Sequence, residues 1–187
     1  MVVPTYWKVP FEWPGNLTLE SEAGPRDAHW LPAREVPQFV ELVATVLAGS
    51  VGPEDRAAVE RFGATGAAER LLSPASGFSY RPGWWEVLVH GSAPAGFVLP
   101  VIYDGARRDD RDEATIYHMG IVPQQRGRGL GRLLLRRAMR TLLDHGVWRI
   151  YCDTPADNAA MIRLFESEGW KRLPAHRRPV DLDAWNA

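Results

Sequence analysis

Residues 122–132 contain three glycines, interleaved with arginines, directly before an amphipathic helical pattern. The first backbone amides of a helix lack partners within the helix, and the helix dipole makes that end partly positive. Glycines let a ligand approach such amides closely and allow positive φ angles. Arginine guanidinium groups supply further donors to phosphate. The segment therefore predicts a phosphate-binding turn between a strand and a helix, and this requirement constrains the fold more than any other feature.

Two common phosphate-binding patterns do not fit this segment. A P-loop requires a lysine after its last glycine, and no lysine lies near the turn. A dinucleotide-binding G-x-G-x-x-G pattern that starts at Gly127 would need glycine in place of Arg132. The same pattern started at Gly129 would need glycine in place of Leu134. The sequence therefore argues against a dinucleotide-binding enzyme.

The hydrophobic periodicity and the turn residues predict an α/β fold with a mixed sheet. Residues 1–15 are rich in proline and aromatic residues and are interpreted as an irregular arm, and the charged residues 104–113 as a solvated hairpin tip. The predicted strands are residues 16–21, 84–90, 95–103, 114–122, 148–153, 170–173 and 180–185. The predicted helices are residues 33–49, 53–62 with a continuation to 72 after Gly63 and Gly66, 130–143 and 157–169.

Length and composition exclude several classes of protein. A chain of 187 residues with ordinary composition is predicted to form a single domain over residues 1–187. The net charge of −1 gives no electrostatic basis for binding nucleic acid or an anionic membrane. No apolar run approaches the roughly 18 residues of a membrane span, and the first residues lack a signal-peptide pattern. The single cysteine, Cys152, excludes an internal disulfide, and no metal-ligand spacing is present. We expect a cytoplasmic protein without a metal.

The glycine turn and the strand before it resemble the acetyl-CoA signature of the GNAT N-acetyltransferase superfamily. That signature is a strand of the type L-x-V-x-P followed by [Q/R]-x-x-G-x-[G/A]. A second resemblance lies in "NAAMIRLFESEGW", which is similar to the family's N-x-x-A-x-x-L-Y-E-x-x-G-F. The two resemblances occur in the family's order and cover about residues 84–172. The matching residues are Met119, Ile121, Pro123, Arg126, Gly129, Gly131, Asn158, Leu164, Glu166 and Gly169.

The resemblance implies a GNAT fold, with a mixed, mostly antiparallel sheet of about six to seven strands, flanked by about four helices. It implies that acetyl-CoA is the acyl donor and that its signature region is residues 114–170. The strand backbone at residues 119–121 would pair with the pantetheine arm, and the amides of residues 127–132 would hold the pyrophosphate. Asn158 would contact pantetheine or simply cap its helix. The residues implied to bind acetyl-CoA are Met119, Gly120, Ile121, Arg126, Gly127, Arg128, Gly129, Leu130, Gly131, Arg132, Asn158 and Phe165.

The implied reaction is transfer of the acetyl group to a primary amine of a small molecule, a peptide or a protein. A neutral amine is needed for attack, so a proton acceptor is required. Asp153, at the end of a predicted strand, and Tyr117, on the same strand parity as Met119, are the candidates; a water relay is a further option. His118 has the opposite parity and is expected to pack or face a helix. Many members have Tyr as the proton donor where this chain has Phe165.

The missing tyrosine leaves a second function open. A GNAT-fold module that binds acyl-CoA and senses or regulates without turnover would not need a proton donor. The expected partners are acetyl-CoA and an amine acceptor, with no nucleic acid and no membrane. The aromatic arm, residues 1–15, is a candidate dimer contact or lid, so a homodimer is also open. The sequence does not identify the acceptor.

Overall fold

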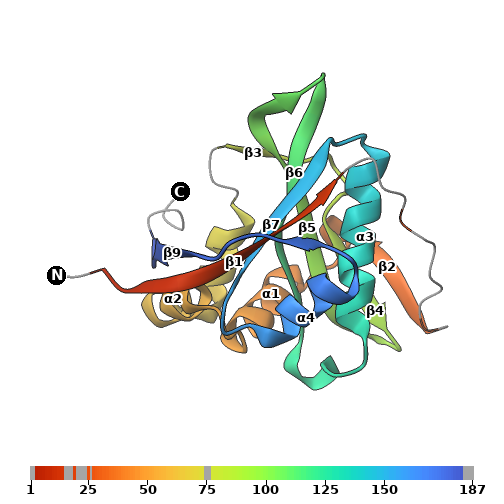
Figure 1. Ribbon diagram of the computed structural model, residues 1–187. Coiled ribbons are helices and arrows are strands. Elements are labelled where there is room, and N and C mark those ends of the chain that lie inside the picture. Colours follow the sequence, from red (N-terminus) through yellow and green to blue (C-terminus); the bar gives the residue numbers. More distant parts are fainter. Residues whose placement is uncertain (1–2, 15–18, 20–24, 26, 74–76, 183–187) are drawn as a thin grey trace.

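The computed structural model describes residues 3–14, 19, 25, 27–73 and 77–182, which form one open sheet with helices on both faces (Figure 1). The strands are β1 Thr5–Pro14, β2 Ala28–Pro32, β3 Phe78–Ser79, β4 Glu86–His90, β5 Ala93–Arg108, β6 Arg111–Ile121, β7 Arg149–Pro155, β8 Lys171–Arg172 and β9 His176–Pro179. The α-helices are α1 Phe39–Ala48, α2 Pro53–Leu72, α3 Leu130–Asp144 and α4 Ala159–Ser167, with 3-10 turns at Ala33–Glu35 and Pro123–Gln125.

The sheet has the strand order β2-β4-β5-β6-β7-β1-β8, with β3 paired to β5 and β9 paired to β1. Every pairing between described strands is antiparallel except that of β6 with β7. The predicted fold class, a mixed and mostly antiparallel sheet with about four helices, is confirmed. Within the described part of the chain, no helix combines the length and apolarity that a membrane crossing requires.

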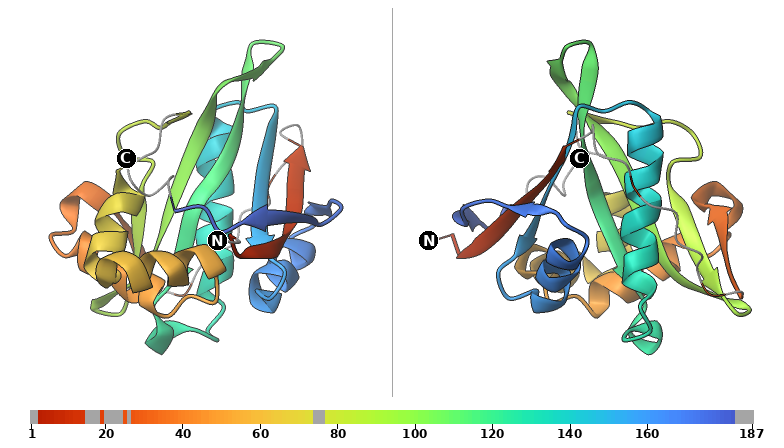
Figure 2. Two further views of the ribbon diagram at one scale, coloured as in Figure 1. Left: turned by 90° about the vertical axis from the view of Figure 1, so that its left-hand side faces the viewer. Right: turned by 45° about the vertical axis from the view of Figure 1, so that its right-hand side comes forward.

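The two faces of the sheet have separate cores. Buried residues of α1 and α2 pack with Val87, Phe97 and Leu99 of β4 and β5 on one face. On the other face, buried residues of α3 pack with the same sheet, and Phe165 of α4 packs beside the far strands β1 and β7. Figure 2 shows the two pairs of helices on opposite sides of the strands. Burial of both faces explains why β4 is apolar at consecutive positions rather than alternating.

The interpretation of residues 1–15 as an irregular arm is wrong. Residues 5–14 form β1, an internal strand that pairs with β7 on one side and with β8 and β9 on the other. Val9, Phe11 and Trp13 recur at every second position and pack in one core with α4 and β7, and Pro10 between the first two is buried as well. The prolines obscured this period-2 pattern, although a strand can include proline where the missing N–H is not needed. The predicted strand at residues 16–21 lies outside the described residues, apart from Leu19.

Other boundaries differ from the prediction in ways that have local causes. The charged residues 104–113 belong mostly to β5 and β6, which continue as a long hairpin to a turn at Asp109 and Asp110, both with positive φ (Figure 1). Helix α2 is broken at Gly63, as predicted, but not at Gly66. The strand predicted at 180–185 does not form at the described residues 180–182, and β9 lies earlier. Strands β2 and β3 were not predicted.

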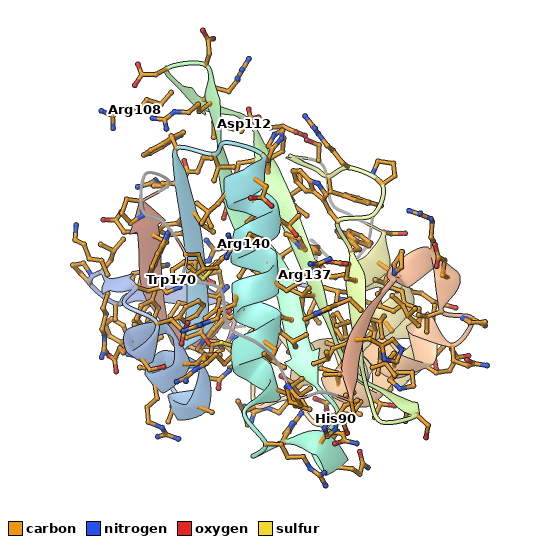
Figure 3. All side chains as sticks on the ribbon, turned by 90° about the vertical axis from the view of Figure 1, so that its right-hand side faces the viewer. His90, Arg108, Asp112, Arg137, Arg140 and Trp170 are labelled. Atoms are coloured by element: carbon orange, nitrogen blue, oxygen red, sulfur yellow. The ribbon has the colours of Figure 1, made fainter. Side chains whose placement is uncertain are left out.

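Helix α3 is attached to its surroundings by arginines spaced along its length (Figure 3). The Arg137 guanidinium donates two hydrogen bonds of 2.6 Å to the buried carboxylate of Glu86 on β4. The Arg140 guanidinium donates to the backbone carbonyl of Leu19 at 2.9 Å. These contacts fix the helix on the sheet, so the position of its first turn, where the glycines lie, is determined by the fold.

Candidate functional site

Strands β6 and β7 separate soon after they meet. They pair only at Glu113 with Arg149 and at Ala114 with Ile150. Beyond this point the Ile116 amide donates to the Cys152 sulfur at 3.4 Å, and no strand pairing to β7 follows among the described residues. The separation opens a cavity of about 1180 Å³, which is lined by every residue predicted for the site: Tyr117, Met119, Gly120, Ile121, Arg126, Gly127, Arg128, Gly129, Leu130, Gly131, Arg132, Asp153, Asn158 and Phe165.

The glycine turn forms the start of α3. Gly129 is the residue before the first helical position and has φ of 77°, and Gly127 has φ of 75°. Both values lie in the left-handed region, where glycine is favoured because other residues meet a Cβ clash. The Leu130 side chain is buried in the core, so only its backbone can face the cavity. The first-turn amides of a 15-residue helix are thus presented to the cavity, an arrangement suited to an anion.

Arg126 supports the turn through its side chain. Its Nε donates to the Ile121 carbonyl at 3.0 Å, and its Nη1 donates to the Gly49 carbonyl at 2.9 Å. These contacts join the end of β6 to the residue that ends α1. The guanidinium of Arg126 is therefore engaged with backbone carbonyls, while Arg128 is exposed at the cavity with no hydrogen bond or ion pair to another described residue.

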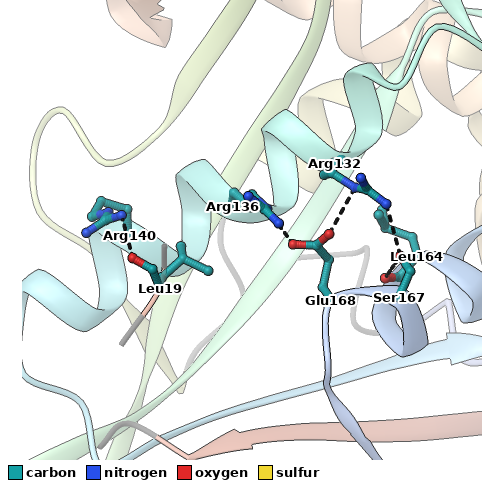
Figure 4. A network of polar contacts seen from close by, with 7 residues as sticks. All are labelled: Leu19, Arg132, Arg136, Arg140, Leu164, Ser167 and Glu168. Carbon is teal, nitrogen blue, oxygen red and sulfur yellow. Dashed lines mark hydrogen bonds and ion pairs between the residues drawn. The ribbon is translucent and has the colours of Figure 1, made fainter. Parts of the chain in front are cut away.

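Arg132 points from α3 toward the end of α4 (Figure 4). Its Nε lies 2.9 Å from Oε1 of Glu168, and its Nη2 donates to the Ser167 hydroxyl at 3.5 Å. Arg136 contacts the other oxygen of the same carboxylate. The Glu168 side chain is only 2% exposed, so it depends on these two arginines for its charge to be balanced. The network joins the two helices that border the cavity on this face.

Asn158 and Phe165 have structural roles that are visible directly. Oδ1 of Asn158 accepts a hydrogen bond from the Met161 amide at 3.2 Å, so Asn158 is the N-cap of α4. The Phe165 ring is stacked on Phe11 of β1, with centroids 4.8 Å apart, and is almost fully buried. Both residues also line the cavity. The ring of Phe165 has no proton to donate, so no group at this position serves as an acid.

Strand β6 contains a β-bulge at Tyr117. Adjacent residues of β5, Leu99 and Pro100, pair with His118 and Ile116 respectively, so Tyr117 is the extra residue. A bulge interrupts the alternation of faces along a strand. The side chains of Tyr117 and His118 therefore both turn toward the face covered by α1 and α2.

This bulge overturns the expectation that Tyr117 shares a face with Met119 and Ile121. Tyr117 packs with the α1 and α2 core, whereas Met119 packs with the α3 and α4 side. His118 faces a helix, as predicted: its Nε2 lies 3.8 Å from Oδ2 of Asp55 on α2. Strand parity alone could not reveal the bulge, because no glycine or proline lies at Tyr117 to signal it.

A cluster of polar side chains lies at the α2 side of the cavity. The Lys8 ammonium of β1 is 2.9 Å from Oδ1 of Asp153 on β7 and 3.7 Å from Oε2 of Glu54 in the first turn of α2. The phenol of Tyr6 lies within the field of both carboxylates. Asp153 was predicted; Tyr6, Lys8 and Glu54 were missed, because nothing in the sequence showed that the N-terminal residues pair with the strand that carries Asp153.

The two tyrosines of this region are held in their protonated forms. Burial raises the pKa of Tyr117, and the negative charge of Glu54 raises it further. Burial also raises the pKa of Tyr6, with added contributions from the charges of Glu54 and Asp153. Protonated phenols donate hydrogen bonds and are poor proton acceptors at neutral pH. The carboxylates of Asp153 and Glu54 are better suited to accept a proton.

Cys152 is a buried residue of the core. By strand alternation it lies on the opposite face from Asp153, in the core beside α4. Burial raises the pKa of its thiol to about 12, so it is a buried apolar group rather than a nucleophile. In the described residues, no group of three or more His, Cys, Asp or Glu side chains is placed to hold a metal ion.

One cavity thus joins two kinds of chemistry. At the end beside α3 it has backbone amides at a helix N-terminus and a free strand edge, which suit a phosphate-bearing, extended ligand. At the other end it has carboxylates beside protonated phenols. An acyl carrier bound at the first end and an acceptor bound at the second could meet between them.

Comparisons with known proteins identify a family and a fold. The model of the Acetyltransferase (GNAT) family matches residues 67–170. The [Ribosomal protein bS18]-alanine N-acetyltransferase of Salmonella typhimurium is 38% identical over 66 residues, which is 35% of this chain and 45% of that protein. The matched part is thus less than half the length of this curated relative.

Solved structures show the same fold. The GCN5-related N-acetyltransferase from Sphaerobacter thermophilus superposes with a TM-score of 0.57 and 18% identity, covering 95% of this chain and 52% of that one. A chain of the NatC complex bound to Gag peptide and CoA superposes with a TM-score of 0.56 and 17% identity, covering 79% of this chain and 87% of that one.

Proposed function

The chain belongs to the GNAT acetyltransferase family, and from this premise we propose that it transfers the acetyl group of acetyl-CoA to a primary amine. The observation that carries the proposal is the glycine turn at the start of α3, which opens into the same cavity as the separated strands and the carboxylates. The acceptor is the amine of a small molecule, a peptide or a protein. The relative from Salmonella typhimurium is named for an alanine acceptor on a ribosomal protein, which is consistent with amine chemistry but does not select the acceptor here.

In this proposal acetyl-CoA is bound mainly by backbone groups. The pyrophosphate lies against the amides of residues 127–132, and the exposed Arg128 adds a guanidinium. The pantetheine arm pairs with the free edge of β6 at residues 119–121. Asn158 and Phe165 form part of the cavity wall. The Arg126 side chain holds the backbone around the turn, and the Arg132 side chain joins α3 to the end of α4.

The acceptor amine loses its proton to Asp153, directly or through water, and attacks the thioester carbon. The N–C bond forms and the carbonyl oxygen becomes an oxyanion near the amides of β6. The attacking nitrogen gives its excess proton to water, the C=O bond forms again, and the C–S bond breaks with its electron pair leaving on sulfur. Tyr117 is disfavoured as the acceptor of the proton, because its raised pKa keeps the phenol protonated. Phe165 cannot donate a proton to the leaving sulfur, so the thiolate leaves without an acid from this position. Departure as a thiolate is feasible because an ordinary thiol has a pKa of roughly 8.5.

Binding is tested by calorimetric titration of acetyl-CoA into the wild-type protein and into Gly129→Glu. The variant puts a negative charge at the phosphate end and a side chain where φ is positive, so it should lose binding. The matched control is Gly146→Glu, which also has positive φ but follows the opposite end of α3, outside the cavity. Equal affinity of wild type and Gly129→Glu would reject the acetyl-CoA site.

Turnover is tested by thiol release from acetyl-CoA across a panel of small amines, amino-terminal peptides and lysine peptides. Release that depends on the amine supports the transferase. The alternative, an acyl-CoA-binding sensor without turnover, is motivated by Phe165, which leaves the site without the family's proton donor. This sensor would bind acetyl-CoA tightly and release no thiol with any amine. Binding of NAD in preference to acetyl-CoA would instead favour a dinucleotide enzyme.

A further inference from the structure

Strand β1 brings a lysine into the acceptor end of the cavity. Lys8 is one of only two lysines in the chain. Its side chain is 14% exposed, and its ammonium touches a carboxylate of β7, Asp153, and approaches a carboxylate of α2, Glu54. Three elements that are distant in the sequence therefore meet at a single positive charge.

The pairing of β1 with β7 fixes this position. Pro10 is the register partner of Asp153, and Lys8 is the partner of Pro155, so Lys8 is diagonal to Asp153 on the same face of the sheet. A diagonal neighbour lies within reach of a long side chain. The contact is thus set by strand register rather than by a flexible surface encounter.

The charges explain what the contact does. Asp153 and Glu54 both approach the same ammonium, so without a cation between them two carboxylates would repel each other in a partly buried place. One ammonium between two carboxylates leaves a net charge of −1. That arrangement separates the two carboxylates by a cation, and the remaining negative charge can attract the acceptor's ammonium and receive its proton.

We propose that Lys8 is a positioning residue of the acceptor site, which orients Asp153 for proton transfer and places a positive charge between Asp153 and Glu54. The inference rests on the proposed acetyl transfer. It makes the N-terminal strand a part of the active site rather than only a part of the sheet. Lys8 acts through the carboxylates and forms no bond with the acetyl group.

Other titratable groups surround the cluster and must be separated from it in a test. The neighbouring phenols have raised pKa values, so they do not titrate between pH 5 and 9. His118 is paired with Asp55, and Arg178 of β9 contributes a positive charge nearby. The charged and titratable groups that line this part of the cavity are Tyr6, Tyr103, Tyr117, Tyr151, Asp55, His118, His176, Arg178 and Asp181.

The experiment compares kcat/KM between pH 5 and 9 for wild type, Lys8→Met, Lys8→Arg and Lys171→Met. Lys171→Met is a matched control, because Lys171 also pairs across β1, with Glu12 at 2.7 Å, but lies outside the cavity. In Lys8→Met the carboxylates lose their cation and hold protons more strongly, so the acidic limb should move up by about one pH unit. At pH 6 to 7, kcat/KM should fall by about tenfold, with acetyl-CoA affinity unchanged.

Lys8→Arg should restore the acidic limb, and Lys171→Met should leave it at the wild-type position. An acidic limb that stays unchanged in Lys8→Met, in a variant that binds acetyl-CoA normally, overturns the positioning role. If Lys8→Met does not fold, Lys8→Arg and Glu54→Gln replace it, and the shift of each variant's acidic limb from the wild-type position is measured. A smaller shift in Lys8→Arg than in Glu54→Gln supports the role. A larger shift in Lys8→Arg overturns it. Failure of the wild-type protein to acetylate any amine is a separate result, which rejects the proposed function itself.

Discussion

At the scale of single residues, the buried thiol gives a direct chemical test of the fold. Burial raises the pKa of Cys152 to about 12, so the reactive thiolate is scarce at pH 8. A thiol-reactive disulfide reagent should therefore not react with the native protein on the timescale of minutes between pH 7 and 9. The same reagent should titrate one thiol at once in guanidinium. Rapid reaction of the native protein would mean that β7 does not bury this residue.

Removing the proposed proton acceptor should affect turnover and little else. Asp153→Asn keeps the size of the side chain but cannot accept the amine's proton, so kcat should fall by about 10² to 10⁴. Tyr117→Phe should change kcat by less than about tenfold, because its phenol is already a poor acceptor. Steady-state rates with the best amine of the panel measure both. A larger loss in Tyr117→Phe than in Asp153→Asn would reverse the assignment.

Individual site residues were predictable where the signal was local. The glycines at 127 and 129 were recognisable because their spacing before a helix is itself the chemical requirement, and both have the positive φ that explains them. Asp153 was recognisable from its place at a strand end. Lys8 and Glu54 were not, because their proximity to Asp153 depends on strand order and on the packing of α2. The bulge at Tyr117 has no sequence signal in this chain.

At the scale of elements, the approach of α1 to β6 depends on a missing side chain. A Cβ built on Gly120 would lie 2.2 Å from Cγ1 of Val46. Gly120→Ala must therefore shift the helix or the strand, and it should reduce the free energy of unfolding by about 1–3 kcal/mol. In a Val46→Ala background the same substitution should cost much less, because the facing methyl groups are gone. Chemical denaturation of the wild type, the two single variants and the double variant measures how far the two losses of stability depend on each other. Losses that simply add would show that the clash is relieved elsewhere.

The contact between α3 and α4 depends on one buried carboxylate (Figure 4). Glu168→Gln removes the charge that Arg132 and Arg136 share, and it should destabilise the fold by about 3–5 kcal/mol, as expected when one partner of a buried pair is lost. Glu166→Gln is the control, because its pair with Arg172 is exposed and should contribute at most about 1 kcal/mol. Urea unfolding measures both. Similar losses in the two variants would contradict the buried network.

Most helices could be predicted because their apolar periodicity and end residues agree, as in α1 and α3. Strands that depend on distant partners were harder. β1 was hidden by Pro10 and Pro14, which are unusual in an internal strand, even though Val9, Phe11 and Trp13 recur at every second position. Strand β3 has only two residues, too few for a periodic signal, and it pairs with β5. The equally short β8 lies within the strand predicted at residues 170–173.

At the scale of the whole molecule, the part of the sheet beyond β7 is built from both ends of the described chain. β1 lies between β7 and the later strands β8 and β9, so the N-terminal strand is covered on both edges (Figure 1). The acceptor end of the cavity includes residues from both of these regions. The pattern of any single segment could not predict this arrangement, because it is a property of strand order.

This strand order predicts that the protein cannot fold without β1. Deleting residues 2–14 exposes the edge of β7 and removes Val9, Phe11 and Trp13 from the core. Each buried side chain of this size contributes about 1.5–3 kcal/mol, so the loss is comparable to the entire stability of a typical domain. The truncated chain should be aggregated or lack a cooperative thermal transition. Deleting only residues 2–3, which precede the strand, should leave the transition at its wild-type midpoint. A cooperative transition near the wild-type midpoint in the longer deletion would show that β7 and the rest of the sheet are stable without β1.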